Sequence, residues 1–432
     1  MFSLQQFTLR KIIVLLTLTA AVVVLSLPNL PWPGNEQELG DSGLPRHAEQ
    51  CVPFYDLISR GFAGERKARN FSDSVSTVIT PLAAYTFPTY SAVTFQTFDT
   101  RVGKVYCWYK DDQLRPLGPP VESVAFPWYT VYCCKYPKAR YIGISTDENN
   151  ASDVTYEEVI VRTENGTKYT LSHCLAPLRG DSTSWLLLTE LIEHYLLYGV
   201  QHFYVYVHSI DPYSRRVLDD YVSTGEVEAI FFAQQPYHEH EMHYTAIQDC
   251  ILRNRYYSSY LIMGDLDERI VMGNANESLV NLVVSTMKQH KNLGSITFWS
   301  RFVFRTADLP PTYKSEKTLR RHLPTLVFDN TTLTKAQKYI KIILNPLRVL
   351  HVTIHWVDVF LGNYTNRYIP MSAGYIRHYR NPFLDAFSTH TRPIIEMSGT
   401  FQTIKYPEHL MGQLFQNVQR RLDRVYKNDL MI

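Results

Sequence analysis

Two aspartates near the middle of the chain offer the clearest chemistry. Asp265-Leu266-Asp267 is the only D-x-D in the 432 residues, and it directly follows the apolar run at residues 260–263. Such a run is typical of a buried strand, and ligands of parallel α/β sheets bind beyond the carboxyl ends of their strands. Paired carboxylates are hard oxygen ligands for Mn²⁺ or Mg²⁺, which can bridge a diphosphate. The pattern therefore predicts a metal site; a solvated acidic turn, or carboxylates that cap the next helix, is the alternative.

Helices and strands alternate around this pair. Apolar residues recur at helical spacing in residues 187–196, after possible N-caps at residues 181–184 and before Gly199, which ends the helix. Further strands are predicted at residues 202–208, 227–232 and 260–263, and further helices at residues 214–222 and 244–256. Strands that are separated by helices of this length indicate βαβ units. The sequence thus predicts an α/β fold with a mostly parallel sheet.

The composition fits a folded protein of two or three domains. Hydrophobic residues make up 45% of the chain and charged residues 19%, as in globular proteins. At roughly 100–200 residues per domain, the chain is long enough for two or three cores. The 43 Lys and Arg residues nearly balance the 41 Asp and Glu residues, and the net charge of +2 gives no support to nucleic-acid binding.

A histidine-rich stretch raises the question of a zinc protease. That class places two histidines four residues apart on one helical face. In His238-Glu239-His240-Glu241-Met242-His243, the positions four residues after His238 and His240 are Met242 and Tyr244. The sequence also contains no G-x-S-x-G, no P-loop motif and no kinase signature. We therefore interpret the stretch as a polar loop.

The first thirty residues indicate a membrane anchor. Residues 12–27 carry no charge, Arg10 and Lys11 precede them, and acidic residues follow. By the positive-inside rule, this order places the N-terminus in the cytosol and the rest of the chain in a lumen. The segment is short for a spanning helix, which suits the thinner membranes of the early secretory pathway; a cleaved signal peptide is the alternative. We expect a single-pass type II protein of the Golgi membrane with a cytosolic tail (1–11), an anchor (12–27) and a stem (28–70).

Cysteines and glycosylation sequons support the lumenal location. All six cysteines follow the apolar segment, and their spacing matches no zinc-binding motif. We expect at least one disulfide, and the adjacent Cys133 and Cys134 should bond to different partners. Six N-x-S/T sequons also follow the segment, at Asn70, Asn150, Asn165, Asn276, Asn330 and Asn363.

Two regions follow the stem. Short alternating stretches in residues 71–165 predict a small β-rich region. Residues 166–432 contain the α/β pattern and end in a basic amphipathic helix at about residues 407–427, which we expect to dock on the rest. No pattern in the sequence indicates an oligomeric state.

Several motifs, taken together and in order, resemble glycosyltransferase family 92, whose members have the GT-A fold. They cover roughly residues 174–380 and are His173-Cys174-Leu175-Ala176-Pro177-Leu178, Trp185 through Glu193-His194-Tyr195 to Gly199-Val200, Gly225-Glu226-Val227, Asp249-Cys250, Asp265-Leu266-Asp267-Glu268, Lys341 through Pro346 to His351 and His355, and His378-Tyr379-Arg380. The resemblance implies a Rossmann-like, mostly parallel sheet. It also implies metal-dependent transfer of a sugar, typically galactose from UDP-galactose, to a glycan with inversion.

The resemblance assigns roles to residues around the acidic pair. Asp265 and Asp267 would bind the metal at the catalytic centre, and Asp265 would also contact the donor. Pro177 and Arg179 belong to Pro177-Leu178-Arg179, which is similar to the P-F-R donor motif of β-1,4-galactosyltransferases. Arg179 would contact the nucleotide or its phosphates, with a surface arginine as the alternative. Asp249 would help to hold the donor, with an ordinary acidic residue as the alternative.

A late histidine is often the third metal ligand in such folds. His378 is the first candidate for this position and His355 is the second, whereas a lone histidine is usually structural. The aromatic residues Trp299 and Tyr313 could stack on sugars, although packing in the core or in a loop explains them equally well.

Inverting transfer also needs a carboxylate that deprotonates the acceptor hydroxyl. We name Glu316 because it lies in the variable segment after the predicted core strand at residues 296–299, where acceptors often dock. Glu239, Glu241 and Asp308 are alternatives among which the sequence does not choose. The rival function is a catalytically inactive lumenal carbohydrate-binding protein with the same fold, which would not need the acidic pair. Metal-dependent hydrolysis of the donor would separate the two functions.

Overall fold

The structure is a computed structural model that describes residues 45–71, 78–97, 101–149, 151–163, 166–180, 183–233, 239–333, 336–381 and 401–427. The predicted tail and anchor, the stem up to residue 44, and Asn150 and Asn165 lie outside the described residues. Within the described ranges, no helix is both long enough and apolar enough to cross a membrane. These ranges all belong to one compact unit, Leu44–Ile432. The division into regions at residues 70 and 165 therefore stays a prediction.

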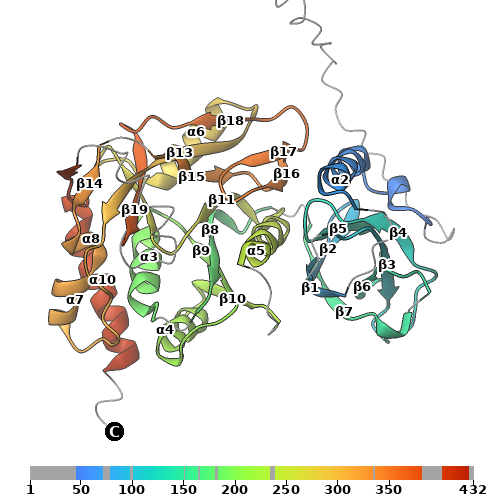
Figure 1. Ribbon diagram of the computed structural model, residues 1–432, viewed down its shortest axis with the longest axis horizontal. Coiled ribbons are helices and arrows are strands. Elements are labelled where there is room, and N and C mark those ends of the chain that lie inside the picture. Colours follow the sequence, from blue (N-terminus) through green and yellow to red (C-terminus); the bar gives the residue numbers. More distant parts are fainter. Residues whose placement is uncertain are drawn as a thin grey trace, which may run out of the picture. The chain divides into compact units, whose positions relative to one another are not determined.

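Seven of the described strands form an antiparallel sheet with one parallel pair in the N-terminal part (Figure 1). The elements are η1 (Ala48–Gln50), α2 (Tyr55–Arg69), β1 (Ile79–Thr86), β2 (Tyr90–Thr97), β3 (Lys104–Lys110), β4 (Val121–Val124), β5 (Thr130–Cys134), β6 (Tyr141–Ser145), η2 (Ala151–Asp153) and β7 (Tyr156–Val161). The strand order is β4-β3-β6-β7-β1-β2-β5. In β3 every second side chain is buried, as its alternating sequence predicts.

Eleven of the described strands form a second, mixed sheet in the C-terminal part. The elements are β8 (Tyr169–Leu178), α3 (Trp185–Leu197), β9 (His202–Val207), α4 (Pro212–Ser223), β10 (Val227–Phe231), α5 (Glu239–Asn254), β11 (Ser258–Gly264), β12 (Glu268–Met272), α6 (Leu279–Gln289), β13 (Leu293–Phe304), α7 (Glu316–His322), α8 (Pro324–Val327), β14 (Asn330–Thr332), β15 (Ala336–Leu344), β16 (Val349–Val352), β17 (Val357–Phe360), β18 (Thr365–Tyr368), β19 (Gly374–Arg380), β20 (Phe401–Thr403) and α10 (Glu408–Tyr426). β16 and β17 pair only with each other among the described strands.

Four neighbouring strands of this sheet run parallel, in the order β10-β9-β8-β11. Every residue of β9 is buried, which is typical of a strand that is covered on both faces. β15 pairs antiparallel with both β11 and β13. The carboxyl ends of the parallel strands meet at one edge, where β8 ends at Leu178, β9 at Val207 and β11 at Gly264. The predicted α/β fold is thus confirmed.

Helices α3 and α10 pack together beside this sheet. All residues of α3 from Trp185 to Tyr195 are buried, so this helix lies inside the core. Leu414, Val418 and Leu422 of α10 follow one another at four-residue spacing and share a hydrophobic cluster with α3. The C-terminal amphipathic helix is therefore docked, as the sequence predicts.

All six cysteines form disulfides. The pairs are Cys51–Cys134, Cys107–Cys133 and Cys174–Cys250. Cys133 and Cys134 bond to different partners, which confirms the prediction from their adjacency. Two of the bridges close the N-terminal part, and the third joins β8 to α5.

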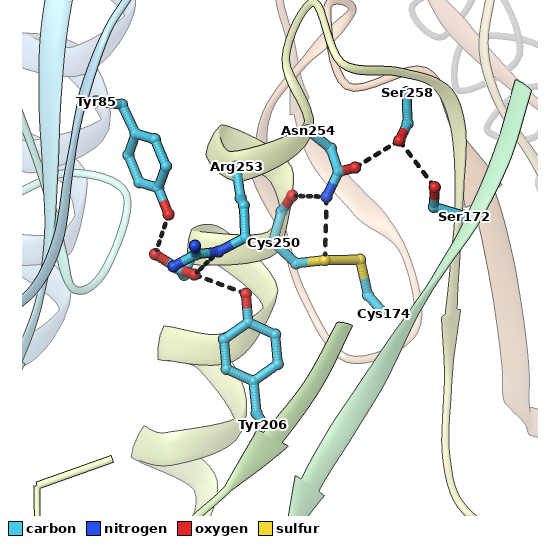
Figure 2. The surroundings of a disulfide bond; sticks show 9 residues. Tyr85, Ser172, Cys174, Tyr206, Cys250, Arg253, Asn254 and Ser258 are labelled. Atoms are coloured by element: carbon cyan, nitrogen blue, oxygen red, sulfur yellow. Dashed lines mark hydrogen bonds and ion pairs between the residues drawn. A yellow bond between two sulfur atoms is a disulfide. The ribbon is translucent and has the colours of Figure 1, made fainter. Parts of the chain in front are cut away.

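Helix α5 also binds the N-terminal sheet through one carboxylate. Asp249 accepts hydrogen bonds from the hydroxyls of Tyr85 and Thr94, both at 2.7 Å, and from Tyr206 of β9 at 2.6 Å. Arg253, one turn later on α5, donates from Nε to the same carboxylate at 3.0 Å. Figure 2 shows Tyr85, Tyr206 and Arg253 of this group beside the disulfide between β8 and α5. The two sheets are thus joined by a buried polar network.

Candidate active site

A cavity of about 760 Å³ lies beyond the carboxyl ends of the parallel strands. Residues that follow β8, β9, β11 and β13 line it, together with the last residue of β19. Its charged lining contains three arginines and three aspartates: Arg179, Asp265, Asp267, Arg305, Asp308 and Arg380. The cavity therefore combines the acidic pair with guanidinium groups, at the edge where open α/β sheets bind ligands.

Asp265 faces a buried lysine and a histidine. Its Oδ2 lies 2.8 Å from Nζ of Lys341 in β15, and its Oδ1 lies 3.9 Å from Nε2 of His243 in α5. Oδ1 is buried and forms no hydrogen bond within the described part of the chain. The position of Lys341 follows from strand pairing, because it lies two residues before Ile343, which pairs antiparallel with Ile262 of β11.

Asp267 is held by two side chains of β19. Its Oδ2 lies 3.2 Å from Nε of Arg380 and 3.4 Å from Nε2 of His378. The backbone explains this proximity, because β12 pairs antiparallel with β19 and sets His378 opposite Glu268. In addition, the N–H of Tyr379 donates to the carbonyl of Asp267 at 2.9 Å. The strand pairing thus brings the second aspartate to the late histidine.

Glu268 is a third carboxylate behind the pair. It is 2% exposed, and its Oε2 accepts a hydrogen bond from the backbone N–H of Asp265 at 3.1 Å. The same oxygen lies 3.5 Å from Nζ of Lys341, and Oε1 lies 3.5 Å from Nδ1 of His378. Glu268 therefore links Lys341, which contacts Asp265, to His378, which contacts Asp267.

Ion pairing keeps the two aspartates charged. Burial raises the pKa of Asp265, but Lys341 and His243 outweigh burial and hold the pKa well below its usual value. Burial likewise raises the pKa of Asp267, and Arg380 and His378 lower it further than burial raises it. The pKa of Glu268 is raised, mainly by burial. Both aspartates are thus anionic at neutral pH.

The structure brings most of the predicted site residues together. Pro177 and Arg179 line the cavity beside Asp265 and Asp267, and His378 lies directly behind Asp267. His355 is a more distant neighbour that does not line the cavity, and its Nδ1 is hydrogen-bonded to the carbonyl of Ile340 at 2.9 Å. Burial, followed by Lys341, lowers the pKa of His355 to about 4.

Two predicted site residues lie elsewhere. Asp249 is fully buried and does not line the cavity, and both of its oxygens bind side chains of the network between the sheets. Glu316 stands in the first turn of α7, where it pairs with Arg320 one turn later, and it does not line the cavity. Glu241, an alternative to Glu316, lines no part of the cavity either, and the side chain of Glu239 lies outside the described residues.

Lys341 and His243 are the residues that sequence reasoning missed. Lys341 belongs to a motif of the family resemblance, but a single lysine in a strand gives no signal of its partners. His243 lies in the stretch that we interpreted as a loop, whereas the structure makes it part of α5. Helical spacing from Met242 to Ala246 and Ile247, which are all buried, would have revealed the helix.

The two proposed stacking aromatics do not line the cavity. Trp299 stacks on Tyr368, with ring centroids 4.7 Å apart. Tyr313 is buried, and its hydroxyl donates to Asp423 of α10, so packing explains this residue. The asparagines of the four described sequons are all exposed, namely Asn70, Asn276, Asn330 and Asn363.

The donor set around the pair suits a hard divalent cation. Asp265 has an unbonded buried oxygen, and Asp267 and His378 lie within 3.4 Å of each other. Carboxylate oxygen and imidazole nitrogen are ligands that Mn²⁺ accepts. In the described residues, however, no group of three or more His, Cys, Asp or Glu side chains is arranged to hold a metal ion. Lys341 and Arg380 form ion pairs with the carboxylates of Asp265 and Asp267.

Several solved structures match part of the chain. HddC from Yersinia pseudotuberculosis is 13% identical, with a TM-score of 0.28, and covers 49% of this chain and 93% of its own. S. aureus TarS 1-349 in complex with UDP is 10% identical, with a TM-score of 0.28 over 60% of this chain and 73% of its own. Glucosyl-3-phosphoglycerate synthase from Mycobacterium tuberculosis, in complex with Mn²⁺, UDP and phosphoglyceric acid, is 12% identical, with a TM-score of 0.27 over 56% of this chain and 88% of its own. At these TM-scores we draw no conclusion from them.

The sequence itself matches a family. No curated protein sequence is significantly similar to the chain. Residues 169–414, more than half of the chain, match glycosyltransferase family 92. The match begins at the first strand of the parallel sheet and ends within α10, so it includes the cavity and every ion pair of the acidic motif. The chain belongs to glycosyltransferase family 92 and has its α/β GT-A fold.

Proposed function

We propose that this glycosyltransferase moves galactose from UDP-galactose to a glycan hydroxyl, in a metal-dependent reaction that inverts the anomeric centre. The observation that carries the proposal is the cavity in which Asp265 and Asp267 face Arg179 and Arg380. A nucleotide diphosphate needs both a cation site and groups that bind phosphate oxygens. The choice of galactose rests on the family resemblance alone.

The arginines of the cavity are suited to the diphosphate. A guanidinium offers paired N–H donors that match phosphate oxygens, and its charge persists when it is partly buried. Arg179 follows β8 and Arg380 ends β19, so the two side chains approach the cavity from different strands. They would orient the donor from both sides of the acidic pair.

Asp265, Asp267 and His378 are the residues that would hold Mn²⁺ or Mg²⁺. A cation held there would supply Lewis acidity and would neutralise the charge that develops on the departing UDP. His378 is fixed by strand pairing with β12, so its ring stays beside Asp267. Lys341 keeps Asp265 charged and in place through the 2.8 Å ion pair.

A donor panel tests this function. A protein that comprises residues 45–432 is incubated with a glycan mixture and each common nucleotide sugar, with and without Mn²⁺. Release of the nucleotide and labelling of the glycan are measured. We expect transfer from UDP-galactose, loss of transfer in EDTA, and recovery on adding Mn²⁺. Transfer from a different nucleotide sugar would contradict only the choice of galactose as the donor sugar. Full transfer in EDTA would contradict the metal dependence. Donor binding without any turnover supports the carbohydrate-binding alternative.

Asp267→Ala tests the site. Its carboxylate would be a metal ligand, and a preorganised electrostatic group of this kind contributes about 10²–10³-fold to the rate. We therefore expect transfer to fall at least about 10²-fold while the circular dichroism spectrum is unchanged. Asp112→Ala, at an exposed position in the N-terminal part, is the matched control and should retain the wild-type rate. An active Asp267→Ala protein would refute the assignment.

We also propose that the enzyme works in the Golgi lumen behind an N-terminal anchor at residues 12–27. Three disulfides support an oxidising compartment, and the four exposed sequons support access to the glycosylation machinery. Protease treatment of intact Golgi vesicles should leave the large C-terminal part protected. Digestion of that part from outside would contradict the topology.

A further inference from the structure

The segment between β13 and α7 supplies a third carboxylate to the cavity. Asp308 lines the cavity together with Asp265 and Asp267. The two aspartates of the acidic motif are ion-paired with Lys341 and Arg380, whereas Asp308 forms no ion pair or hydrogen bond with any residue that the structure describes. Asp308 is also exposed to solvent, so its carboxylate is open to a ligand that enters the cavity.

The segment that carries Asp308 is anchored on both sides. Before it, the backbone N–H of Arg305 donates to the carbonyl of Arg380 at 2.9 Å, which continues the pairing of β13 with β19. After it, Leu309 packs against the hydrophobic cluster of α3, and the carbonyl of Pro310 accepts a hydrogen bond from Nε1 of Trp185 at 3.1 Å. These contacts lie one to three residues from Asp308, so they hold it at the wall of the cavity.

The other carboxylates near the cavity are poor bases for an acceptor hydroxyl. A base must carry a carboxylate that is both accessible and able to accept a proton. Asp265 and Asp267 are already ion-paired with Lys341 and Arg380, and they are the residues that would hold the cation. Glu268 is 2% exposed and lies behind the pair. Glu316 does not line the cavity and pairs with Arg320.

We infer that Asp308 is the general base of the transfer reaction, an inference that rests on the proposed function. In this step the acceptor oxygen forms a bond to C1 of the donor sugar, and its proton passes to the Asp308 carboxylate. The bond between C1 and the β-phosphate oxygen breaks, and its electron pair leaves with UDP. Inversion requires that the Asp308 carboxylate and the departing diphosphate lie on opposite sides of the reacting carbon.

Asp308→Asn tests the inference, with Glu316→Gln as the matched control. Transfer is measured with whichever nucleotide sugar the wild type uses, and UDP binding is measured by calorimetry in the presence of Mn²⁺. General-base catalysis contributes about 10²–10⁴-fold, so kcat of Asp308→Asn should fall by about that factor, with KM for the donor and UDP affinity unchanged within about twofold. Glu316→Gln should keep the wild-type kcat. Asp308→Glu should recover part of the lost rate.

The pH profile separates catalysis from a structural role. Wild-type kcat should decrease at acid pH as the base becomes protonated. The residual kcat of Asp308→Asn should not show this decrease at acid pH. An Asp308→Asn protein that folds, binds UDP and transfers sugar at the wild-type rate overturns the inference. A fall in kcat that occurs in Glu316→Gln and not in Asp308→Asn overturns it as well. If Asp308→Asn does not fold, Asp308→Ser is measured in the same way. A wild type that transfers no sugar refutes the proposed function, and the inference falls with it.

Discussion

Lys341 shows how strongly single residues of the site depend on one another. Its side chain is 3% exposed, and its ammonium contacts both Asp265 and Glu268. Burial lowers the pKa of Lys341, but the two carboxylates raise it further, so the lysine is charged. Removing one partner from a buried ion pair leaves uncompensated charge and costs about 3–5 kcal/mol.

We therefore expect Lys341→Met to lower the free energy of unfolding by about 3–5 kcal/mol at pH 7, measured by urea denaturation. Lys405→Met is the control, because that lysine is 71% exposed and its ion pair with Glu408 spans 3.8 Å. An exposed pair of this kind contributes about 0–1 kcal/mol. Equal stabilities of the two variants would show that Lys341 does not compensate the acidic motif.

His194 makes the stability of the protein depend on pH. Its Nε2 is hydrogen-bonded to the carbonyl of Ile270 at 2.9 Å, and its Nδ1 to the hydroxyl of Tyr406 at 2.8 Å. Burial, followed by Arg269, holds the pKa of His194 well below its usual value, so the folded protein keeps this ring neutral. The unfolded chain binds the proton below about pH 6.5, and stability is lost as the pH falls through that value.

Between pH 7 and pH 5, one such histidine should lower the free energy of unfolding by about 2 kcal/mol. We expect His194→Gln to be less stable than the wild type at pH 7 but to lose about 2 kcal/mol less on acidification. Urea denaturation at both pH values measures this difference. An identical loss in both proteins would mean that His194 is protonated in the folded state.

At the scale of elements, α5 is the helix on which both sheets depend. Asp249 binds two side chains of the N-terminal sheet, one of β9 and one of its own helix. Asp249→Asn removes the charge that balances the buried Arg253 and turns one acceptor oxygen into a donor. We expect a loss of about 3–5 kcal/mol in urea denaturation, with unchanged UDP affinity in the folded protein.

Asp219→Asn is the control for this variant, because Asp219 is 54% exposed and pairs only one turn along its own helix with Arg215. It should cost no more than about 1 kcal/mol. If Asp249→Asn keeps its stability but loses UDP affinity, Asp249 is a donor ligand after all, and its place in the network is secondary.

Helices and strands with an apolar pattern in their own sequence were predictable, and those without such a pattern were not. The expected strands at residues 202–208 and 227–232 correspond to β9 and β10, because both are apolar runs bounded by turns. Helix α5 begins at Glu239, five residues before the expected start, since its polar first turn has no apolar period. β15 was not predicted, and Lys341 reaches Asp265 over 76 positions of sequence. Such a contact exists only after strand pairing.

At the scale of the whole molecule, the acidic motif was predictable as a site but its charge balance was not. The position of Asp265 and Asp267 follows from a strand that is visible in the sequence. Their partners come from α5, β15 and β19, which the fold brings together from distant segments. The hydrogen-bond partners of Asp249 were not predictable for the same reason, because a buried network between two sheets leaves no pattern along the chain.

The shared helix α5 also sets the order in which the chain can mature. Tyr85 and Asp249 are 164 positions apart, and a ribosome adds about 5–20 residues per second. Asp249 is therefore synthesised roughly 8–33 seconds after Tyr85 of the N-terminal sheet. During that interval its own two disulfides are the only covalent ties it can form. The part of this enzyme that is synthesised first is thus completed only when the middle of the chain has been synthesised.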